Sequence, residues 1–356
     1  MEQQRQRPRI ARYKPYYFKP VPGKTYLWCS CGRSANQPFC DGSHRGTEFE
    51  PVRYTATEAD GEILFCGCKH TKVRPFCDGA HNNLKDTYDE DDPDSEANRC
   101  ITTVIHDRDG RFELNGACYV GRVSGIAPSE RGNTRWRALV TAATGAKYQS
   151  FFHLEVSGGH SPVMAFGDAD VVLLATAGDG RIEISGRSFP LAPESGIYVR
   201  PRETFRIDNP GEESISLYLA VCPQAAEPDF TRPMHDSFDA AHPDRVVPFD
   251  QSKRQQMGDR TFQLLVNKAT GSELVTQFIG TIPRSKAAPH RHLYEETLVV
   301  LRGNGMMWTE DLKAKVGAGD FIFLPAKQLH SLQCNDPAGM LVAGVIYPGG
   351  NPNINY

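Results

Sequence analysis

The chain has 356 residues, of which 39% are hydrophobic, so it is long enough for two or three domains with sizeable cores. Its formal net charge of −3 gives no sign of nucleic acid as a partner. No stretch approaches the roughly 18 apolar residues of a membrane span. The basic N-terminal segment RQRPRIARYKPYYFKP also lacks the apolar core of a secretory signal. We therefore expect a cytoplasmic protein whose partners include neither nucleic acid nor a membrane.

One metal-ligand pattern occurs twice in the first quarter of the chain. Its two copies are Cys29, Cys31, Cys40 and His44, and then Cys66, Cys68, Cys77 and His81. Each copy has the form CxC, eight residues, Cys, three residues, His, and each ends in PFCDGSH or PFCDGAH. Three thiolates and one imidazole make a soft tetrahedral site, which suits either zinc or an iron–sulfur cluster.

Both copies also match a longer pattern, CxCxx(S/T)xxxPxCDG(S/A/T)H, through Ser34, Pro38, Thr71 and Pro75. On these residues the segment 8–90 resembles the CDGSH iron–sulfur family. The resemblance implies that each motif binds one [2Fe–2S] cluster through three Cys and one His. A neutral His in place of a thiolate should raise the reduction potential of such a cluster, and it leaves one ligand that acid can protonate. The alternative is a pair of zinc knuckles that staple a small domain.

The rest of the chain is predicted to be mainly β. After the first domain, residues 1–92, an acidic stretch poor in large aliphatic residues predicts a solvated linker at 93–100. From residue 101 onward, short β-rich runs alternate with glycine and proline turns, which favours antiparallel barrels or sandwiches. We expect two such units, at 101–225 and 256–356, joined by a connector at 226–255 that is rich in Pro, Asp and His.

The second β unit contains a candidate metal site. It reads PHRHLYEETLVVLRGNG and, further on, GDFIFLPAKQLHSLQCN. His290 and His292 alternate along a strand and so point to one side, Glu296 follows them in the sequence, and His330 follows a proline turn. If the barrel closes over them, three imidazoles and one carboxylate would suit Fe(II), Mn(II), Ni(II) or Zn(II).

These residues resemble the two sequence motifs of the cupin superfamily, namely His290xHis292xxxGlu296 with Gly303, and Gly319xxxxxPro325 with His330. The resemblance implies two double-stranded β-helix (jelly-roll) barrels, and it assigns His290, His292, Glu296 and His330 as metal ligands. The sequence departs from the family at Lys327, which stands where the family has a glycine, and this weakens any inference about the shape of the loop.

The first β unit looks like a copy without a site. Aligning Gly178 with Gly303 and Pro201 with Pro325 suggests an internal duplication. On this alignment the four ligand positions fall near residues that are not usual metal ligands, Ala165, Gly167, Val171 and Arg206. His153 and His160 lie nearby and leave an irregular site open, but a structural partner of the second barrel is the preferred interpretation.

Cupins with a His-rich mononuclear site include Fe(II) dioxygenases. The combined features predict an O₂-dependent non-haem iron dioxygenase for a small molecule, in which two [2Fe–2S] clusters relay electrons from an external donor to one mononuclear Fe(II). The candidate catalytic residues are Tyr294, Arg284 and Lys327, and the same strands and loops carry Gln277, Lys286 and Trp308.

Two other functions stay open. One is an electron-transfer or redox-sensing protein whose cupin half only binds a ligand or a partner. The other is a zinc or manganese isomerase, which would leave the iron–sulfur domain without a role. The substrate stays open between thiols, amino-acid derivatives, aromatic acids and natural-product intermediates, and a homodimer is also left open.

Overall fold

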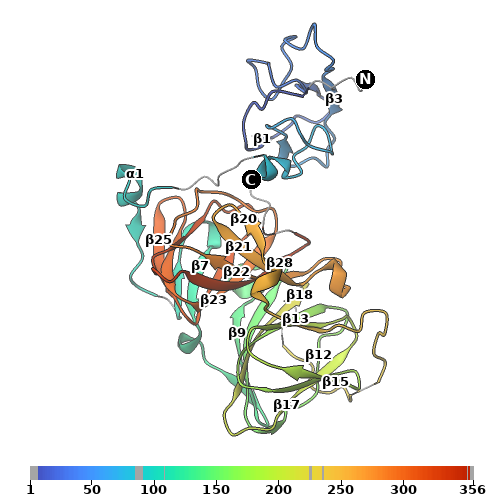
Figure 1. Ribbon diagram of the computed structural model, residues 1–356, viewed down its shortest axis with the longest axis vertical. Coiled ribbons are helices and arrows are strands. Elements are labelled where there is room, and N and C mark those ends of the chain that lie inside the picture. Colours follow the sequence, from blue (N-terminus) through green and yellow to red (C-terminus); the bar gives the residue numbers. More distant parts are fainter. Residues whose placement is uncertain are drawn as a thin grey trace. The chain divides into compact units, whose positions relative to one another are not determined.

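Strands make up almost all of the regular structure. The computed structural model describes residues 7–84, 91–107, 109–223, 227–234, 236–350 and 352. The chain divides into two units, one comprising Met1–Thr87 with Asn353–Tyr356 and the other comprising Tyr88–Pro352. Within the described residues there is one α-helix, α1 (Glu96–Arg99), and the 3-10 turns are η1 (Ala80–Asn83), η2 (Asn115–Ala117), η3 (Val123–Gly125), η4 (Ala142–Thr144), η5 (Gln251–Lys253) and η6 (Lys268–Thr270). The predicted mainly β fold class is confirmed (Figure 1).

The N-terminal unit interleaves its two halves. Strand β1 (Tyr16–Phe18) pairs with β4 (Ile63–Phe65), and β2 (Thr25–Trp28) pairs with β3 (Val52–Thr55), both antiparallel. β2 ends directly before Cys29, and β4 ends directly before Cys66. The last residues of these strands, Trp28 and Phe65, are fully buried in one aromatic core. The two motif copies therefore share a single core and form one domain.

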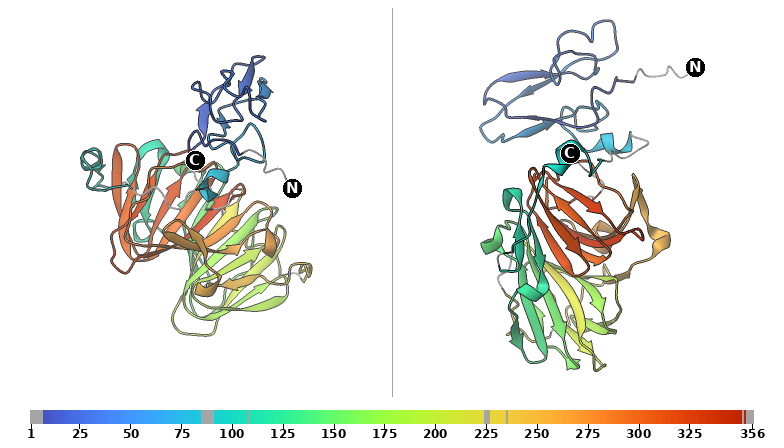
Figure 2. Two further views of the ribbon diagram at one scale, coloured as in Figure 1. Left: turned by 45° about the horizontal axis from the view of Figure 1, so that its top comes forward. Right: turned by 90° about the vertical axis from the view of Figure 1, so that its left-hand side faces the viewer.

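The second unit consists of two barrels that lie side by side (Figure 2). The first is formed by β8 (Ser129–Arg131), β9 (Thr134–Val140), β10 (Ser150–Val156), β11 (Gly159–His160), β12 (Met164–Ala165), β13 (Asp170–Ala177), β14 (Gly180–Ile184), β15 (Arg187–Leu191), β16 (Ser195–Val199), β17 (Thr204–Asn209) and β18 (Ile215–Cys222). The C-terminal barrel is formed by β20 (Gln255–Met257), β21 (Arg260–Val266), β22 (Thr276–Ile282), β23 (Glu295–Arg302), β24 (Asn304–Trp308), β25 (Leu312–Gly317), β26 (Asp320–Leu324), β27 (Ser331–Cys334) and β28 (Met340–Tyr347).

The strand before each barrel pairs with the other barrel. β7 (Tyr119–Arg122) precedes the first barrel but pairs with β26 of the C-terminal one, and β19 (Val246–Pro248) precedes the C-terminal barrel but pairs with β16 of the first. In addition, β6 (Arg111–Glu113) pairs with β7, and β5 (Thr102–Thr103) pairs with β25. We expected the first barrel to begin at residue 101 and the connector at 226–255 to lie between the barrels. The structure corrects both expectations, because each exchanged strand covers an open sheet edge of the other barrel.

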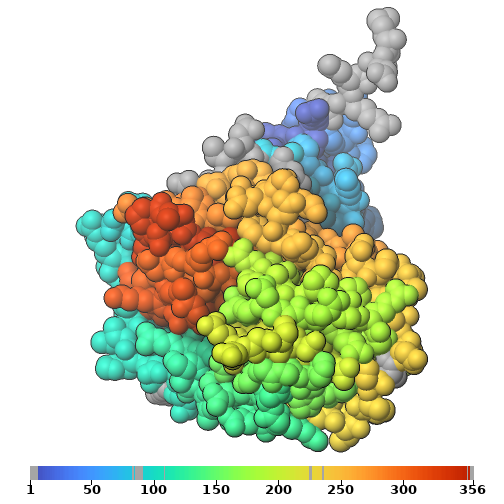
Figure 3. Space-filling model, turned by 60° about the horizontal axis from the view of Figure 1, so that its bottom comes forward, coloured from blue at the N-terminus to red at the C-terminus, as the bar shows by residue number. Residues whose placement is uncertain are grey.

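The central strands are apolar on both faces because one face fills a barrel and the other faces the neighbouring barrel. Along β13, Val171 and Leu173 belong to the core of the first barrel, whereas Val172 and Leu174 pack in clusters that also contain residues of the C-terminal barrel, such as Val345. Burying each such side chain contributes roughly 1.5–3 kcal/mol. In the space-filling view the red and orange surface of the C-terminal barrel directly adjoins the green surface of the first barrel (Figure 3).

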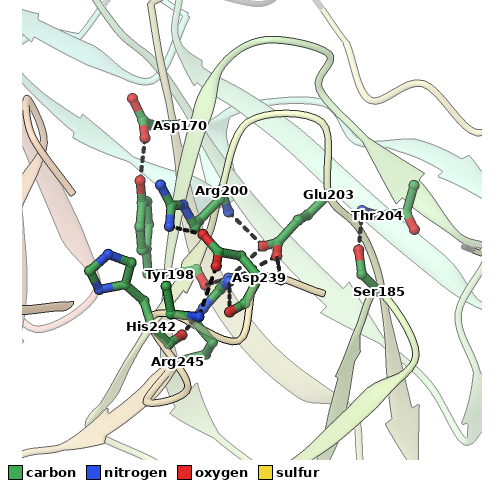
Figure 4. A network of polar contacts seen from close by, with 10 residues as sticks. Asp170, Ser185, Tyr198, Arg200, Glu203, Thr204, Asp239, His242 and Arg245 are labelled. Atoms are coloured by element: carbon green, nitrogen blue, oxygen red, sulfur yellow. Dashed lines mark hydrogen bonds and ion pairs between the residues drawn. The ribbon is translucent and has the colours of Figure 1, made fainter. Parts of the chain in front are cut away.

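The connector is held to the first barrel by a buried ion pair (Figure 4). The guanidinium of Arg245 donates to both carboxylate oxygens of Glu203, at 2.5 and 2.8 Å, and its Nε donates to the carbonyl of His242. Arg200 contributes its backbone N–H to Glu203 and pairs through its side chain with Asp239. The side chain of Arg245 is 0% exposed, so this pair fixes the course of the segment that leads into β19.

The acidic linker is also more ordered than its composition predicts. Ser95 caps α1 by accepting a hydrogen bond from the backbone N–H of Asn98, and Asn98 is itself buried. Asp91 pairs with the ammonium of Lys286, a buried residue of the C-terminal barrel. The described part of this segment, residues 91–100, is therefore anchored at Asp91 and Asn98, while most of its other side chains are exposed, as expected for a linker. An acidic residue joins the packed structure here because it neutralises a buried cation, and the remainder of the acidic stretch, residues 85–90, lies outside the described residues.

Candidate functional site

The C-terminal barrel brings three predicted ligands together from segments far apart in the sequence. His290 lies in the loop between β22 and β23, and His330 lies just before β27. The two residues are directly opposite each other, and each backbone N–H donates to the other's carbonyl at 3.0 Å. His292 follows two residues after His290. The imidazole atoms available as ligands on the three residues all lie within 4.8 Å of one another.

Hydrogen bonds set the tautomers of two of these rings. Nδ1 of His290 lies 2.9 Å from the carbonyl oxygen of Ala288, and Nδ1 of His330 lies 2.9 Å from that of Gln328. A carbonyl can only accept, so each Nδ1 must carry the proton and each Nε2 keeps a free lone pair. Binding a metal requires this form, and such partners of the other ring nitrogen are the usual way that proteins orient histidine ligands.

Burial keeps these rings neutral. It lowers the pKa of His290 well below its usual value, with further lowering from His330 and His292. It also lowers the pKa of His330 to about 3, with a smaller contribution from His292. Neutral imidazole is the state that coordinates a metal, so His290 and His330 do not need to lose protons at neutral pH before they bind one.

Glu296, the fourth predicted ligand, lies beside the histidines. It is the second residue of β23 and is buried, and its Oε2 is 2.9 Å from Nδ1 of His292. The neighbouring Glu295 has a different role, because it accepts the backbone N–H groups of Lys147 and Tyr148 in the first barrel at 2.7 and 2.8 Å. The compact ligand group of the described residues is therefore the three histidines, and the Glu296 carboxylate lies against one of them, His292. Three imidazoles with a carboxylate beside them fit a first-row divalent metal.

The three candidate catalytic residues differ in how close their side chains lie to the histidines. Tyr294 is buried and stacks on the ring of His292 with ring centroids 4.8 Å apart. Lys327 donates its backbone N–H to the carbonyl of His292 at 2.6 Å, but its side chain is exposed. Its φ of +69° is left-handed, which is the conformation that favours the family's glycine at this position. Arg284 is exposed, and the neighbour on which its charge acts is Cys334. The structure thus brings Tyr294, but not the side chain of Arg284 or Lys327, to the histidines.

Among the weaker candidates, Gln277 lies elsewhere, because it donates to the carbonyl of Leu173 between the two barrels. Lys286 and Trp308 lie closer to the site. The ammonium of Lys286 is 4.9 Å from the centre of the Trp308 ring, and both residues line a cavity of about 250 Å³ that also touches His330. This cavity is the natural place for a small ligand next to the histidine group.

Arg260 was missed by the sequence analysis. It begins β21, is buried, and donates from Nη2 to the carbonyl of Leu332 at 2.7 Å. Its positive charge contributes to the low pKa of both His290 and His330. No local pattern could have identified it, because Arg260 lies 30 residues before the first histidine and reaches the site only when the barrel closes.

In the first barrel the corresponding positions are apolar. In the first barrel, Ile182 lies four residues after Gly178 and pairs with Ile207. In the C-terminal barrel, Met307 lies four residues after Gly303 and pairs with Leu332, so these positions correspond. In the first barrel, Phe205 lies two residues before Ile207 and pairs with Met164. In the C-terminal barrel, His330 lies two residues before Leu332 and pairs with His290. The strand pairing thus shifts three of the expected equivalents by one residue. Met164, Phe166 and Phe205 replace Ala165, Gly167 and Arg206, while Val171 remains the equivalent of Glu296.

These four apolar residues pack in the core of the first barrel, so that barrel offers no ligand at the site. His153 and His160 do not form an irregular one. His153 bonds the hydroxyl of Ser216 at 2.9 Å, and His160 is exposed beside Asp208. Within the described part of the chain, the compact three-ligand group is that of His290, His292 and His330.

The two N-terminal motifs have matching geometry. The N–H of Cys29 bonds to the carbonyl of Pro38 at 2.9 Å, and Cys66 bonds to Pro75 at the same distance. The aspartate of each CDG sequence accepts a backbone hydrogen bond from its own loop. Asp41 accepts the N–H of Ala35, and Asp78 accepts the N–H of Lys72, both at 2.8 Å.

Within each motif the ligands come as two pairs. In the first copy the Sγ atoms of Cys29 and Cys31 are 3.6 Å apart, and Sγ of Cys40 is 3.1 Å from Nδ1 of His44. In the second copy the two pairs, Cys66 with Cys68 and Cys77 with His81, are each separated by 3.5 Å. Four ligands of one zinc ion, each about 2.0–2.3 Å from the metal, would all lie within about 4.6 Å of one another. Such a compact group is not found among the described Cys residues, and two separate pairs fit a dinuclear centre in which each iron takes two protein ligands.

Comparison with known families agrees with both sites. Residues 3–45 match the family described as "Iron-binding zinc finger CDGSH type", and residues 279–344 match the family described as "Cupin domain". The chain joins a CDGSH domain to a cupin domain. The cupin match contains all four candidate ligands of the C-terminal barrel, and the CDGSH match contains the first of the two Cys/His motifs.

Curated relatives resemble the two parts separately. The CDGSH domain is 50% identical over 54 residues to "CDGSH iron-sulfur domain-containing protein 3, mitochondrial" of Mus musculus and 49% identical over 51 residues to the Homo sapiens protein. These segments are 15% and 14% of this chain and span 39% and 40% of the relatives. Over 113 residues, which are 30% of this chain and 33% of the relative, the chain is 27% identical to "Quercetin 2,3-dioxygenase" of Bacillus subtilis (strain 168).

Solved structures support the pair of cupin barrels. The E. coli protein Ylba matches with a TM-score of 0.53 at 15% identity, covering 68% of this chain and 95% of that one. An oxalate decarboxylase of Lactobacillus farciminis, solved as a formate complex, matches with a TM-score of 0.51 at 12% identity, covering 65% and 86%. At such identities these likenesses concern the fold alone.

The described residues contain no helix that is long and apolar enough to span a membrane. The cytoplasmic location expected from the sequence stays a prediction, and the names of both CDGSH relatives call those proteins mitochondrial.

Proposed function

We propose that the C-terminal cupin barrel holds a mononuclear Fe(II) and acts as an O₂-dependent oxygenase on a small molecule. In this proposal the CDGSH domain holds two [2Fe–2S] clusters and supplies single electrons, taken from an external donor, that keep the cupin iron ferrous. The observation that carries the proposal is the compact group of His290, His292 and His330 beside buried Glu296, in a chain that also carries two Cys₃His motifs.

The residues present fit a metal in the cupin barrel. His290, His292, Glu296 and His330 would hold it, and two of the rings already have the tautomer that coordination needs. Bound Fe(II) would supply coordination positions at which dioxygen and a substrate react. The mutual backbone bonds of His290 and His330 fix the spacing of these two ligands before any metal binds, so little reorganisation is needed.

Other side chains would position the substrate and restrain the ligands. The stacking of Tyr294 on His292 restricts the rotation of that ring. The cavity beside His330 offers the Trp308 ring as an apolar wall and Lys286 as a cation, although Asp91 already neutralises that cation. Arg260 is a second buried cation whose charge acts on His330, and Asp259 Oδ1 lies 3.8 Å from its Nε. The positive charge of Arg260 that Asp259 does not offset would favour an anionic substrate such as a carboxylate.

Two clusters, and not two zinc ions, are supported by the paired ligands of both motifs. The second motif lies beyond the segment that matches the CDGSH family, but it repeats the spacing, the backbone bonds and the ligand pairs of the first. The name of the B. subtilis relative, a quercetin dioxygenase, supports dioxygen chemistry for the cupin barrel.

The proposal is tested by oxygen consumption. Protein purified without air and loaded with iron is supplied with a one-electron donor and a panel of small acids and thiols. We expect substrate-dependent oxygen uptake that is lost in His330→Ala and kept in His160→Ala, a matched control because His160 is exposed and outside the site. If iron-loaded protein binds panel members but takes up no oxygen, the cupin half is a ligand-binding partner of a redox module and the oxygenase proposal is wrong.

A further inference from the structure

Lys69 is a fully buried lysine of the second CDGSH motif. It follows Cys68 directly, and its exposure is 0%. Lysine is almost never buried completely unless its charge has partners, because removing an ammonium from water costs several kcal/mol. The partners of this residue therefore indicate what its charge acts on.

The ammonium contacts residues adjoining both motifs. Its Nζ donates to the carbonyl oxygen of Cys66 at 3.0 Å, and the indole Nε1 of Trp28 donates to the same oxygen at 3.1 Å. Nζ also lies 4.7 Å from the centre of the Trp28 ring, within the range of a cation–π contact. Trp28 directly precedes Cys29 of the first motif. One carbonyl and one cation thus join the ligand loop of the second motif to the start of the first.

The backbone of Lys69 indicates that its side chain has a role. The residue has φ +70°, and its counterpart after the CxC of the first motif is Gly32 with φ +73°. A non-glycine residue is strained in this region, so glycine would satisfy the turn at a lower cost. At Gly32 a side chain is excluded, because a Cβ atom would lie 1.7 Å from the carbonyl oxygen of Arg9. Only the second motif can place a side chain at this point, and it places a lysine there.

The ammonium lies close to the ligand loops of both motifs. Its Nζ bonds to the carbonyl oxygen of Cys66, a ligand of the second motif, and it lies over the ring of Trp28, which directly precedes the ligand Cys29 of the first. The backbone N–H of Lys69 is also 3.3 Å from Sγ of Cys66. A charge at this position would act on any centre that either motif holds, and in a buried site that action is strong because little water screens it.

We propose that Lys69 is a shared tuning residue whose buried ammonium raises the reduction potential of both cluster sites. The inference rests on the proposed function in one respect, that both motifs hold [2Fe–2S] clusters. Each site takes up one electron from an external one-electron donor, with no bond made or broken and no proton moved. The electron adds one negative charge, so a fixed cation nearby stabilises the reduced state more than the oxidised one.

The test is a potentiometric titration of the complete iron-loaded protein, followed by visible absorption and electron paramagnetic resonance. Lys69→Gln removes the charge and keeps a hydrogen-bond donor, whereas Lys69→Met removes both. Lys72→Met is the matched control, because Lys72 is an exposed lysine of the same motif. His44→Cys and His81→Cys each change one site and so assign the two reduction steps.

We expect reduction of both sites to become at least tenfold less favourable in both Lys69 variants, which is about 59 mV for one electron, and to stay unchanged in Lys72→Met. Unshifted potentials in Lys69→Gln, or a shift confined to the second motif, would overturn the inference. If both variants lose their clusters, Lys69→Gly is used, since glycine suits this backbone. Loss of clusters from all three variants would assign Lys69 to assembly and also overturn the inference. Zinc at the Cys/His motifs of the parent protein would instead contradict the proposed function, and the role of Lys69 would then not arise.

Discussion

Removing one partner of the buried pair of Arg245 and Glu203 should clearly destabilise the first barrel. Glu203→Gln removes the negative charge and leaves a guanidinium that is 0% exposed without its counterion. Breaking a buried pair by removing one partner costs about 3–5 kcal/mol. Glutamine keeps one acceptor oxygen, so we expect the lower end, about 3 kcal/mol, or roughly a 100-fold change in the folding equilibrium.

Urea unfolding measures this loss through the fluorescence of Trp136, a residue of the first barrel's core. At a slope of about 3 kcal/mol per molar, the midpoint should fall by about 1 M. Asp168→Asn is the control, because it breaks the exposed pair with Arg202 and should leave the midpoint nearly unchanged. In Glu203→Gln combined with Arg245→Met the loss should be smaller than the sum of the two single losses, because no buried charge is left alone. Equal midpoints for Glu203→Gln and Asp168→Asn would refute this reasoning.

Three further predictions concern the two sites. His330→Ala should abolish binding of the mononuclear metal and leave the visible absorption of the clusters intact, as measured by metal analysis and spectroscopy; a full metal content in the variant would show that the ligands are misassigned. His44→Cys or His81→Cys should lower the potential of its own cluster and slow the loss of colour at mildly acidic pH, because the fourth ligand becomes a thiolate; decay equal to that of the parent would contradict this. Lys327→Gly should leave stability unchanged or raise it by up to about 1 kcal/mol in urea unfolding, because φ is +69° there, and a clear destabilisation would show that the lysine side chain is needed.

Ligand sets could be predicted from the sequence because they are encoded locally. The repeated spacing from Cys29 to His44 and from Cys66 to His81 identifies the four candidate ligands of each motif. Their arrangement as two close pairs was not predicted and is seen only in the structure. His290 and His330 are 40 residues apart, yet each belongs to a motif specific enough to be aligned separately. The geometry between the motifs, including the paired backbone bonds, required the structure.

The strand exchange could not be predicted, because an alternating pattern identifies a strand but not the sheet edge that it joins. β7 was predicted as part of the first barrel and β19 as part of the connector, but β7 pairs with the C-terminal barrel and β19 with the first barrel. The equivalents in the first barrel were misplaced for a related reason. Met164 and Val171 are seven residues apart where His290 and Glu296 are six, and one extra residue is enough to shift an alignment that has no gap.

The burial of three charged side chains was the other feature that could not be predicted from the sequence. Arg260, Lys69 and Lys286 look like ordinary surface residues in the sequence, and each is buried in the structure. Their partners, such as Asp91 for Lys286, come from segments far away or from backbone carbonyls, which carry no signal in the sequence.

The measurement that tests the account most directly is Mössbauer spectroscopy with total metal analysis on protein prepared without air. The account predicts about four irons per chain in dinuclear sulfide-bridged centres and about one in a separate high-spin ferrous site, with the latter absent from His330→Ala. Zinc at the Cys/His motifs, or iron in the dinuclear centres with none in the cupin barrel under iron-replete conditions, would contradict it.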